Sequence, residues 1–146
     1  MNREINPKMY MYKRVVEAKL YMDSHYHEKI DLNNISNQAN FSKYHFLRLF
    51  KHAFGKSPHQ YLIETRLLAA KKLLRENNSV KDTCYKVGFE SVPSFITLFK
   101  KRENITPNEY LKKNKQVEKE KEERPLSFIP NCFVENFGWD KGGGNK

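Results

Sequence analysis

Two short stretches of this sequence have the pattern of amphipathic helices, and both end in cationic side chains. One stretch, FSKYHFLRLFK, ends at Lys51, and the other, SVPSFITLFKKR, ends at Arg102. Lys and Arg bind phosphate groups, and Arg can also form two parallel hydrogen bonds with the major-groove edge of guanine. The chemistry that these side chains favour is therefore the recognition of a nucleic acid.

Other kinds of site lack the residue patterns that they require. We find no nucleophile–base pattern, no phosphate-binding glycine loop and no metal-ligand cluster, so an enzyme is the least favoured class and no cofactor is expected. His25 and His27 would lie on different faces of a helix. Cys84 and Cys132 form neither a disulfide framework nor a four-ligand metal site. Cys84 is predicted to pack in a core, with redox sensing as the alternative.

The segment from Thr83 to Tyr110 predicts the elements that present the second cationic stretch. A short helix ends at Val87, and Gly88 can adopt the left-handed conformation that closes it. A second helix follows over about 91–102. Its expected inward face holds apolar residues at helical spacing, namely Phe95, Leu98 and Phe99. A helix, a tight turn and a basic amphipathic helix are the parts of a helix-turn-helix DNA reader.

An upstream copy of this pattern strengthens the interpretation. The corresponding segments are 32–41 and 80–89, 46–51 and 95–100, and 55–61 and 104–110. A period of about fifty residues relates them, so each copy is one supersecondary unit. Asn104 stands where the first copy has Gly55, and Asn tolerates the left-handed region better than other non-glycine residues.

Capping residues and prolines mark the ends of the remaining helices. Residues 12–26 predict one helix that packs on the first copy, and Pro58 and Pro107 open further helices, the second of which runs to about residue 113. The residues predicted to cap helix N-termini are Asp31, Ser42, Ser79 and Thr106.

The helix that begins at Pro58 is predicted to connect the two copies. It runs over 58–76, and about eighteen residues at 1.5 Å each give a length of roughly 27 Å. Two recognition helices must lie about 34 Å apart to enter successive major grooves on one face of DNA. A stiff connecting helix therefore allows a single polypeptide to read an asymmetric site.

The motifs GF-x-S, F-x-x-x-FKK and ITP-x-x-Y in the second copy have counterparts in S-x-x-x-F-x-RLFK of the first copy and in RLLAAKKLL between them. Together they resemble the AraC/XylS family of bacterial transcription regulators. The resemblance covers residues 10–113 and implies an all-α fold of two homeodomain-like helix-turn-helix subdomains joined by a long central helix. The expected segments are 32–53, 58–76 and 80–103.

The resemblance also implies a function and a setting. It points to sequence-specific binding of double-stranded DNA by a transcription regulator, an activator that works with RNA polymerase as a monomer or weak dimer. No apolar run is long enough to span a membrane, and the N-terminus MNREINPKMY lacks the apolar region of a secretory signal. The expected location is the cytoplasm.

In the first unit, the positions that the family uses to reach bases match Tyr44, Leu47 and Arg48. Ser42, Lys43 and Lys51 lie beside them. The Arg48 guanidinium could pair with guanine O6 and N7 for about 1–3 kcal/mol of discrimination; the alternative is a surface charge without a role. The side chains expected to face inward on this helix are Phe46, Leu49, Phe50 and Ala53.

In the second unit, the matching positions are Val92, Pro93 and Thr97. Val92 and Pro93 have no side-chain donor, so they can offer apolar contact alone, and Thr97 stands where an arginine is common in the family. We therefore expect this unit to anchor phosphates and the first unit to read most of the sequence. The residues expected to anchor phosphates are Lys86, Ser91, Lys100 and Lys101.

The charge distribution agrees with a polyanion partner. The chain carries a formal net charge of +10, and residues 1–115 hold 22 of its 27 Lys and Arg residues but 11 of its 17 Asp and Glu residues. A basic body of this kind is typical of nucleic-acid binding. Two alternatives stay open: a helical protein-interaction module that uses its basic face on an acidic partner, and a structure-tolerant RNA binder.

Residues 114–146 lie outside the resemblance. The run KNKQVEKEKEER predicts either a solvated helical extension or a disordered linker. The segment that follows is too apolar for an ordinary disordered end, since it holds Phe128, Ile129, Phe133, Val134, Phe137 and Trp139. We expect this tail to fold back on the body, with docking on a partner or ordering in an oligomer as the alternatives.

Overall fold

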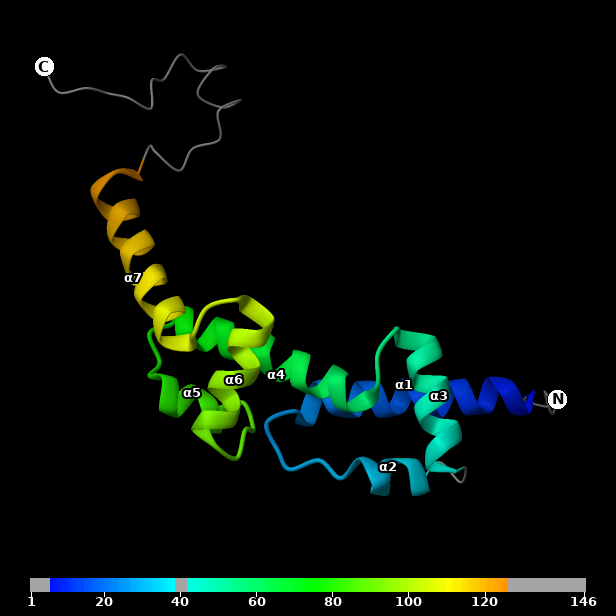
Figure 1. Cartoon of the computed structure of the whole chain (residues 1–146). Helices are drawn as coiled ribbons and strands as arrows, with labels where there is room; N and C mark the ends of the chain where they lie inside the picture. The colour runs from blue at the N-terminus through cyan, green and yellow to red at the C-terminus, as the bar shows by residue number, and fades with distance from the viewer. Residues whose placement is uncertain (1–5, 39–41, 126–146) are drawn as a thin grey trace, which may run out of the picture.

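The helices follow one another in the order that the sequence predicts. The computed structural model describes residues 6–38 and 42–125, and over these ranges the chain is helical, with no strand (Figure 1). The helices are α1 (Pro7–His25), α2 (Leu32–Gln38), α3 (Lys43–Phe54), α4 (Pro58–Arg75), α5 (Val80–Lys86), α6 (Val92–Glu103) and α7 (Pro107–Glu123). The predicted all-α fold, with a long helix between two helix-turn-helix units, is confirmed.

The internal repeat of the sequence is also a repeat of the structure. The short helices α2 and α5 each have 7 residues, and α3 and α6 each have 12. The aromatic contacts repeat as well: Phe50 and Tyr61 have ring centroids 5.8 Å apart at 69°, and Phe99 and Tyr110 have theirs 5.6 Å apart at 69°. The same local sequence therefore builds the same packing unit twice.

Four helices begin at the N-cap residues that the sequence predicts. The Ser42 side chain accepts a hydrogen bond from the His45 backbone N–H, and Asp31 does the same for the Asn33 N–H. Ser79 and Thr106 act alike on α5 and α7. Each such bond satisfies an amide that the helix itself leaves unpaired.

The second helix of each unit, α3 and α6, ends in the same way. Gly55 ends α3 with φ +74°, and Asn104 ends α6 with φ +64°. Both residues are in the left-handed region, and each backbone N–H donates back to a carbonyl four residues earlier. The expectation that Asn104 replaces a glycine in this role is confirmed.

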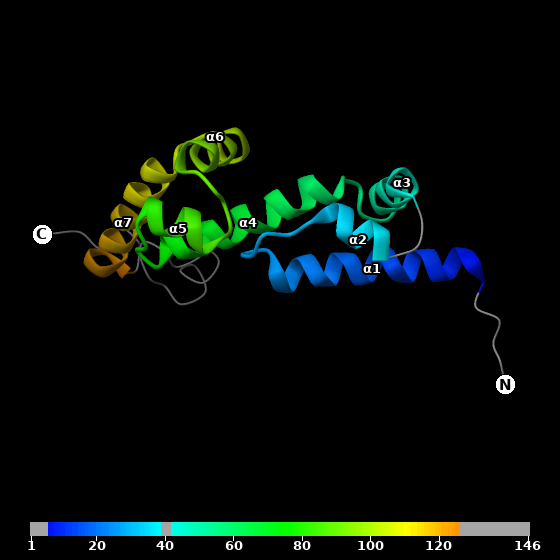
Figure 2. The same cartoon turned by 90° about the horizontal axis from the view of Figure 1, so that it is seen from below.

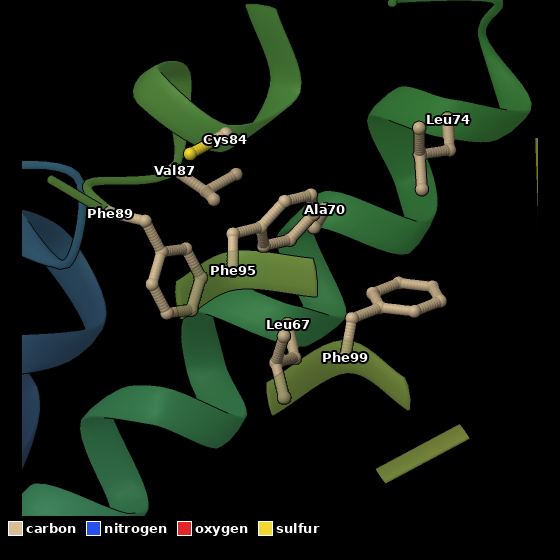
Figure 3. Close-up of a cluster of buried hydrophobic side chains, with 8 residues drawn as sticks. All are labelled: Leu67, Ala70, Leu74, Cys84, Val87, Phe89, Phe95 and Phe99. Carbon is tan, nitrogen blue, oxygen red and sulfur yellow. The ribbon is translucent and has the colours of Figure 1, made fainter. Parts of the chain in front are cut away.

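Each unit has its own core, and α4 contributes to both. In the first, Phe46 and Phe50 of α3 pack with Val15, Ala18 and Met22 of α1 and with Leu62 of α4. In the second, the rings of Phe89, Phe95 and Phe99 gather around Leu67 and Ala70 of α4 (Figure 3). Cys84 is fully buried in this second core, and burial raises the pKa of its thiol. A thiol held in its neutral form is a packing residue, as the sequence predicts.

Three details differ from the sequence-based expectation. Helix α1 begins at Pro7, five residues before the expected start, because Asn6 caps it through the Lys8 N–H. Helix α7 continues to Glu123, which corresponds to the helical alternative for the charged run. Ala53, expected to face inward, is exposed: it lies in the last turn of α3, beyond Phe46 and Phe50, the residues of this helix that the first core buries. The apolar tail, including Trp139, lies outside the described residues.

The turn at Gly88 is the point where the second unit touches the first. Its φ of +98° lies in the left-handed region, as predicted. A Cβ at this position would lie 2.7 Å from the Tyr26 carbonyl oxygen and 3.0 Å from Arg66 Nε. Glycine is therefore required here by its conformation and by the close approach of the segment that follows α1.

Gly55 provides a matched control for this requirement, because its φ is also positive but a Cβ would meet no atom within 4 Å. We expect Gly55→Ala to lower the free energy of unfolding by about 1 kcal/mol, through backbone strain alone. Gly88→Ala should cost at least about 1–2 kcal/mol more, because a backbone carbonyl obstructs its methyl group. Urea unfolding followed by circular dichroism measures both. Equal losses would contradict the close approach.

Candidate nucleic-acid interface

The two helices expected to read bases project from one face of the molecule. Figure 2 shows α3 and α6 both on the side of the molecule away from α1, with α6 above α4 and α3 beyond the right-hand end of α4. Seen in Figure 1, both helices cross in front of the longer helices behind them and run in the same general direction. Helix α4, with 18 residues, has a length of about 27 Å and separates them. This arrangement presents two similar helices side by side, as two major grooves in succession require.

The outward face of α3 carries cations and one exposed ring. Lys43, Arg48 and Lys51 are exposed, and Tyr44 is 70% exposed. The Arg48 guanidinium lies 5.6 Å from the centroid of the Tyr44 ring. Stacking on the ring orients a planar guanidinium without using its hydrogen-bond donors. Arg48 is therefore held outward with its donors available to a ligand.

The outward face of α6 offers fewer free donors to bases. Pro93 and Thr97 are exposed, and the Thr97 hydroxyl donates to the Pro93 carbonyl at 3.0 Å. Lys100 and Lys101 are exposed in its last turn. The Ser91 oxygen accepts the Ser94 N–H at 3.3 Å, which leaves its own proton free to donate. This face can hold anions but has little with which to distinguish one base from another.

Some of the predicted site residues have other contacts. Leu47 and Val92 are half-buried, and each packs against the core of its own unit, so only part of either side chain is available. Lys86 is exposed and donates to the Asn78 side chain at 2.9 Å. Ser42 is exposed immediately before α3, as its N-cap. Twelve of the thirteen predicted residues thus lie on α3, on α6 or next to them, and the thirteenth, Lys86, is on α5.

Sequence reasoning missed Arg66, which joins the two units. Its Nε donates to the Tyr26 carbonyl at 2.7 Å, and its Nη2 donates to the Glu28 carbonyl at 3.0 Å. The guanidinium also lies 5.9 Å from the Phe89 ring centroid. Burial lowers the pKa of Arg66, although the guanidinium stays charged. The residues around an arginine within a helix do not indicate that it will form such long-range hydrogen bonds.

Ion pairs occupy several other cations near the interface. Glu64 on α4 pairs with Lys56 and, at 2.6 Å, with Arg102 of α6. Glu103 pairs with Lys71 at 3.2 Å. These cations are partly neutralised, whereas Arg48, Lys100 and Lys101 form no ion pair within the part of the chain that the structure describes.

The described ranges show no arrangement suited to metal binding, since no three His, Cys, Asp or Glu side chains come close enough together. None of the helices in these ranges combines the length and apolarity that crossing a membrane requires.

Comparison with known proteins gives a consistent result. Residues 35–113 match the protein family described as "Helix-turn-helix domain". The chain is 35% identical over 96 residues to the HTH-type transcriptional regulator in the cgkA 5′ region of Pseudoalteromonas carrageenovora, covering 66% of this chain and 57% of that protein. It is 35% identical over 99 residues to AdaA of Bacillus subtilis, a bifunctional transcriptional activator and DNA repair enzyme, covering 67% of this chain and 47% of AdaA. The chain thus spans about half the length of these relatives.

Among solved structures, the chain is similar to the DNA-binding domain of AdpA, a global transcriptional factor, in complex with a target DNA. The similarity has a TM-score of 0.64 at 27% identity and covers 76% of this chain and 96% of that chain.

Arg66 allows a direct test of how the two units are joined. We expect Arg66→Lys to lower the free energy of unfolding by about 1.5–3 kcal/mol, because an ammonium cannot make both carbonyl bonds of the guanidinium fork. Arg75→Lys, at an exposed site on the same helix, should change it by less than about 0.5 kcal/mol. Chemical denaturation of both variants measures the change in the free energy of unfolding. Similar values for the two would show that the Arg66 bonds contribute nothing to stability.

Proposed function

Because this chain belongs to the AraC/XylS-type helix-turn-helix family, we propose that it is a sequence-specific transcription regulator that binds double-stranded DNA. It inserts α3 and α6 into successive major grooves on one face of the duplex. The bound DNA lies across the face that carries the exposed cations of both helices. The role that we favour is that of an activator, with RNA polymerase as a further partner in the cytoplasm of a bacterium.

The observation that supports this proposal most is the placement of α3 and α6 near opposite ends of a single stiff helix, both on the side of the molecule away from α1. Two helices on opposite sides could not contact the same duplex together. A helical module for an acidic protein partner would need the basic face but would not need two similar helices in parallel. A binder of RNA helices is disfavoured as well, because the deep, narrow major groove of A-form RNA does not admit side chains.

We propose that the two helices divide the work. Arg48, oriented by Tyr44, reads a guanine in the half-site of the first unit, and Lys51 and Lys43 hold the adjacent phosphates. In the second unit, Lys100 and Lys101 bind phosphates, and Pro93 and the exposed part of Val92 make apolar contacts. The intrahelical bond of the Thr97 hydroxyl is consistent with this division, because it leaves α6 with little hydrogen-bonding capacity toward bases.

We assign the reading unit to residues 10–113, with the helix-turn-helix segments at 32–53 and 80–103 and the connecting helix at 58–76. Residues 114–146 are an extension of unassigned role. No catalytic activity is proposed: AdaA is named as an enzyme too, and the similarity spans 47% of that protein. One chain carries both reading helices, so a monomer or a weak dimer suffices for binding.

The division of work predicts different defects for two single substitutions. Arg48→Ala should relax base preference in one half of the site, at a cost of about 1–3 kcal/mol for the preferred sequence. Lys100→Ala should weaken binding to all duplexes alike. Lys119→Ala is the control, because this lysine is exposed near the C-terminal end of α7, a helix that extends away from α3 and α6 (Figure 1).

Selection of bound duplexes from a random pool, performed with the wild type and the three variants, provides the measurement. A wild type that enriches no motif would overturn the proposed function. A wild-type motif that Arg48→Ala leaves unchanged would remove the role assigned to Arg48 but not the function.

The proposed interface also predicts a steep dependence on salt. With about six to ten phosphate contacts, the affinity for a selected duplex should fall by about 10³–10⁵ between roughly 50 and 200 mM salt. Lys100→Ala should reduce the magnitude of the log–log slope by about 1. Fluorescence anisotropy with labelled duplex measures both quantities. Binding that barely changes with salt would favour an interface other than the DNA backbone.

A further inference from the structure

Glu64 of α4 makes ion pairs with both helix-turn-helix units. One carboxylate oxygen pairs with the Lys56 ammonium, which lies between α3 and α4 in the first unit. The other accepts a hydrogen bond from Arg102 Nη1 at 2.6 Å, and Arg102 is in the last turn of α6. Through one side chain, the end of the first reading helix, the connecting helix and the end of the second reading helix are tied together.

The other contacts of α6 hold it within the second unit. Phe95 and Phe99 are buried with Leu67, Ala70 and Leu74, which lie in the second half of α4. The Lys71–Glu103 pair, at 3.2 Å, also joins α6 to this half. Toward the first unit, a cleft of about 440 Å³ opens between Gly55 and Gln60 on one side and Leu98 on the other. Glu64 lies in the wall of this cleft, so its ion pairs connect groups on its two sides.

The surroundings of Glu64 favour its two ion pairs, which we call the Glu64 clamp, at neutral pH. Its side chain is 26% exposed, so solvent screens its pairs less than it would at a fully exposed site. The hydrogen bond from Lys56 has the largest effect on the pKa of the Glu64 carboxyl and lowers it. Burial opposes this shift, and the charges of Arg102 and Lys56 lower the pKa further, so that the net shift is downward. Because the pKa is lower in the folded state, the stabilisation is fully present above the ordinary carboxyl pKa and is lost as the pH falls from that value through the lower pKa of the folded state.

We propose that Glu64 is a positioning residue that fixes the separation and angle of α3 and α6, and so sets the spacing between the two half-sites in DNA. The inference rests on the proposed function. One base pair more or less moves a half-site by about 3.4 Å and turns it by about 35° around the duplex axis. A rigid pair of helices rejects such a site, whereas a pair with a free hinge tolerates it.

Glu64→Gln is the discriminating variant, because it keeps the size of the side chain and removes the charge that holds both cations. The ratio of affinities for the preferred spacing and for a spacer one base pair longer or shorter should fall by about three- to ten-fold. Binding to the wrong spacing should tighten, because Lys56 and Arg102 become available to phosphates. A variant that is only destabilised would bind every duplex more weakly.

Glu103→Gln is a matched control. The Glu103 side chain is 21% exposed, a fraction similar to the 26% of Glu64, and its substitution changes the net charge by the same amount. The pair that it breaks joins α6 to the second half of α4 and leaves Lys56 and Arg102 in place. Its spacing ratio should remain within about two-fold of the wild type. Thermal unfolding of both variants establishes that they are folded at the temperature of the binding assay.

The experiment has two stages, and each can fail separately. Selection from a random duplex pool with the wild-type chain first identifies two motifs and their spacing; enrichment of no motif overturns the proposed function. Anisotropy titrations of the wild type, Glu64→Gln and Glu103→Gln then use that duplex and its spacer variants. A loss of spacing preference in Glu64→Gln alone supports the clamp. An unchanged preference in Glu64→Gln, or an equal loss in both variants, overturns it while leaving the proposed function intact.

Discussion

The structure depends on one helix that serves two hydrophobic cores. Leu62, in the first half of α4, is buried with the aromatic side chains of α3, and Leu67, Ala70 and Leu74 are buried with those of α6. A rigid helix that is fixed at both ends by close-packed side chains transmits position from one unit to the other. The phase of these apolar residues around α4 decides on which sides the two units pack.

Polar contacts at the junction refine the arrangement that the two cores leave open. The Arg66 guanidinium holds the carbonyls of Tyr26 and Glu28 against the turn at Gly88, where no larger residue fits. A half-buried cation with few alternative partners is costly to release, because its donors would lose bonds that water replaces poorly in that setting. The junction therefore favours one relative orientation of the two units.

Some cations near the proposed interface form ion pairs, and others do not. Glu64 and Glu103 hold Lys56, Arg102 and Lys71 in ion pairs. Arg48, Lys100 and Lys101 remain exposed on the helices themselves. In the proposed function, the net charge of +10 draws DNA to the molecule, and the unpaired cations decide where the phosphates rest.

The sequence by itself determined the repeated parts: which segments are helices, where Ser42, Ser79 and Thr106 cap them, and where Gly88 and Asn104 turn the chain. These features depend on neighbours within a few residues, so spacing and residue type suffice to predict them. The candidate faces of α3 and α6 were predictable for the same reason, although Ala53 was expected to face inward and is exposed. Only the tertiary structure decided how the two units face each other and which charges are paired. Glu64 and Arg102 are brought together by the packing of α6 on α4, and Arg66 meets Tyr26 and Glu28 through the path of the chain after α1. Contacts between residues almost forty positions apart leave no periodic trace in a single sequence, because nothing local requires them.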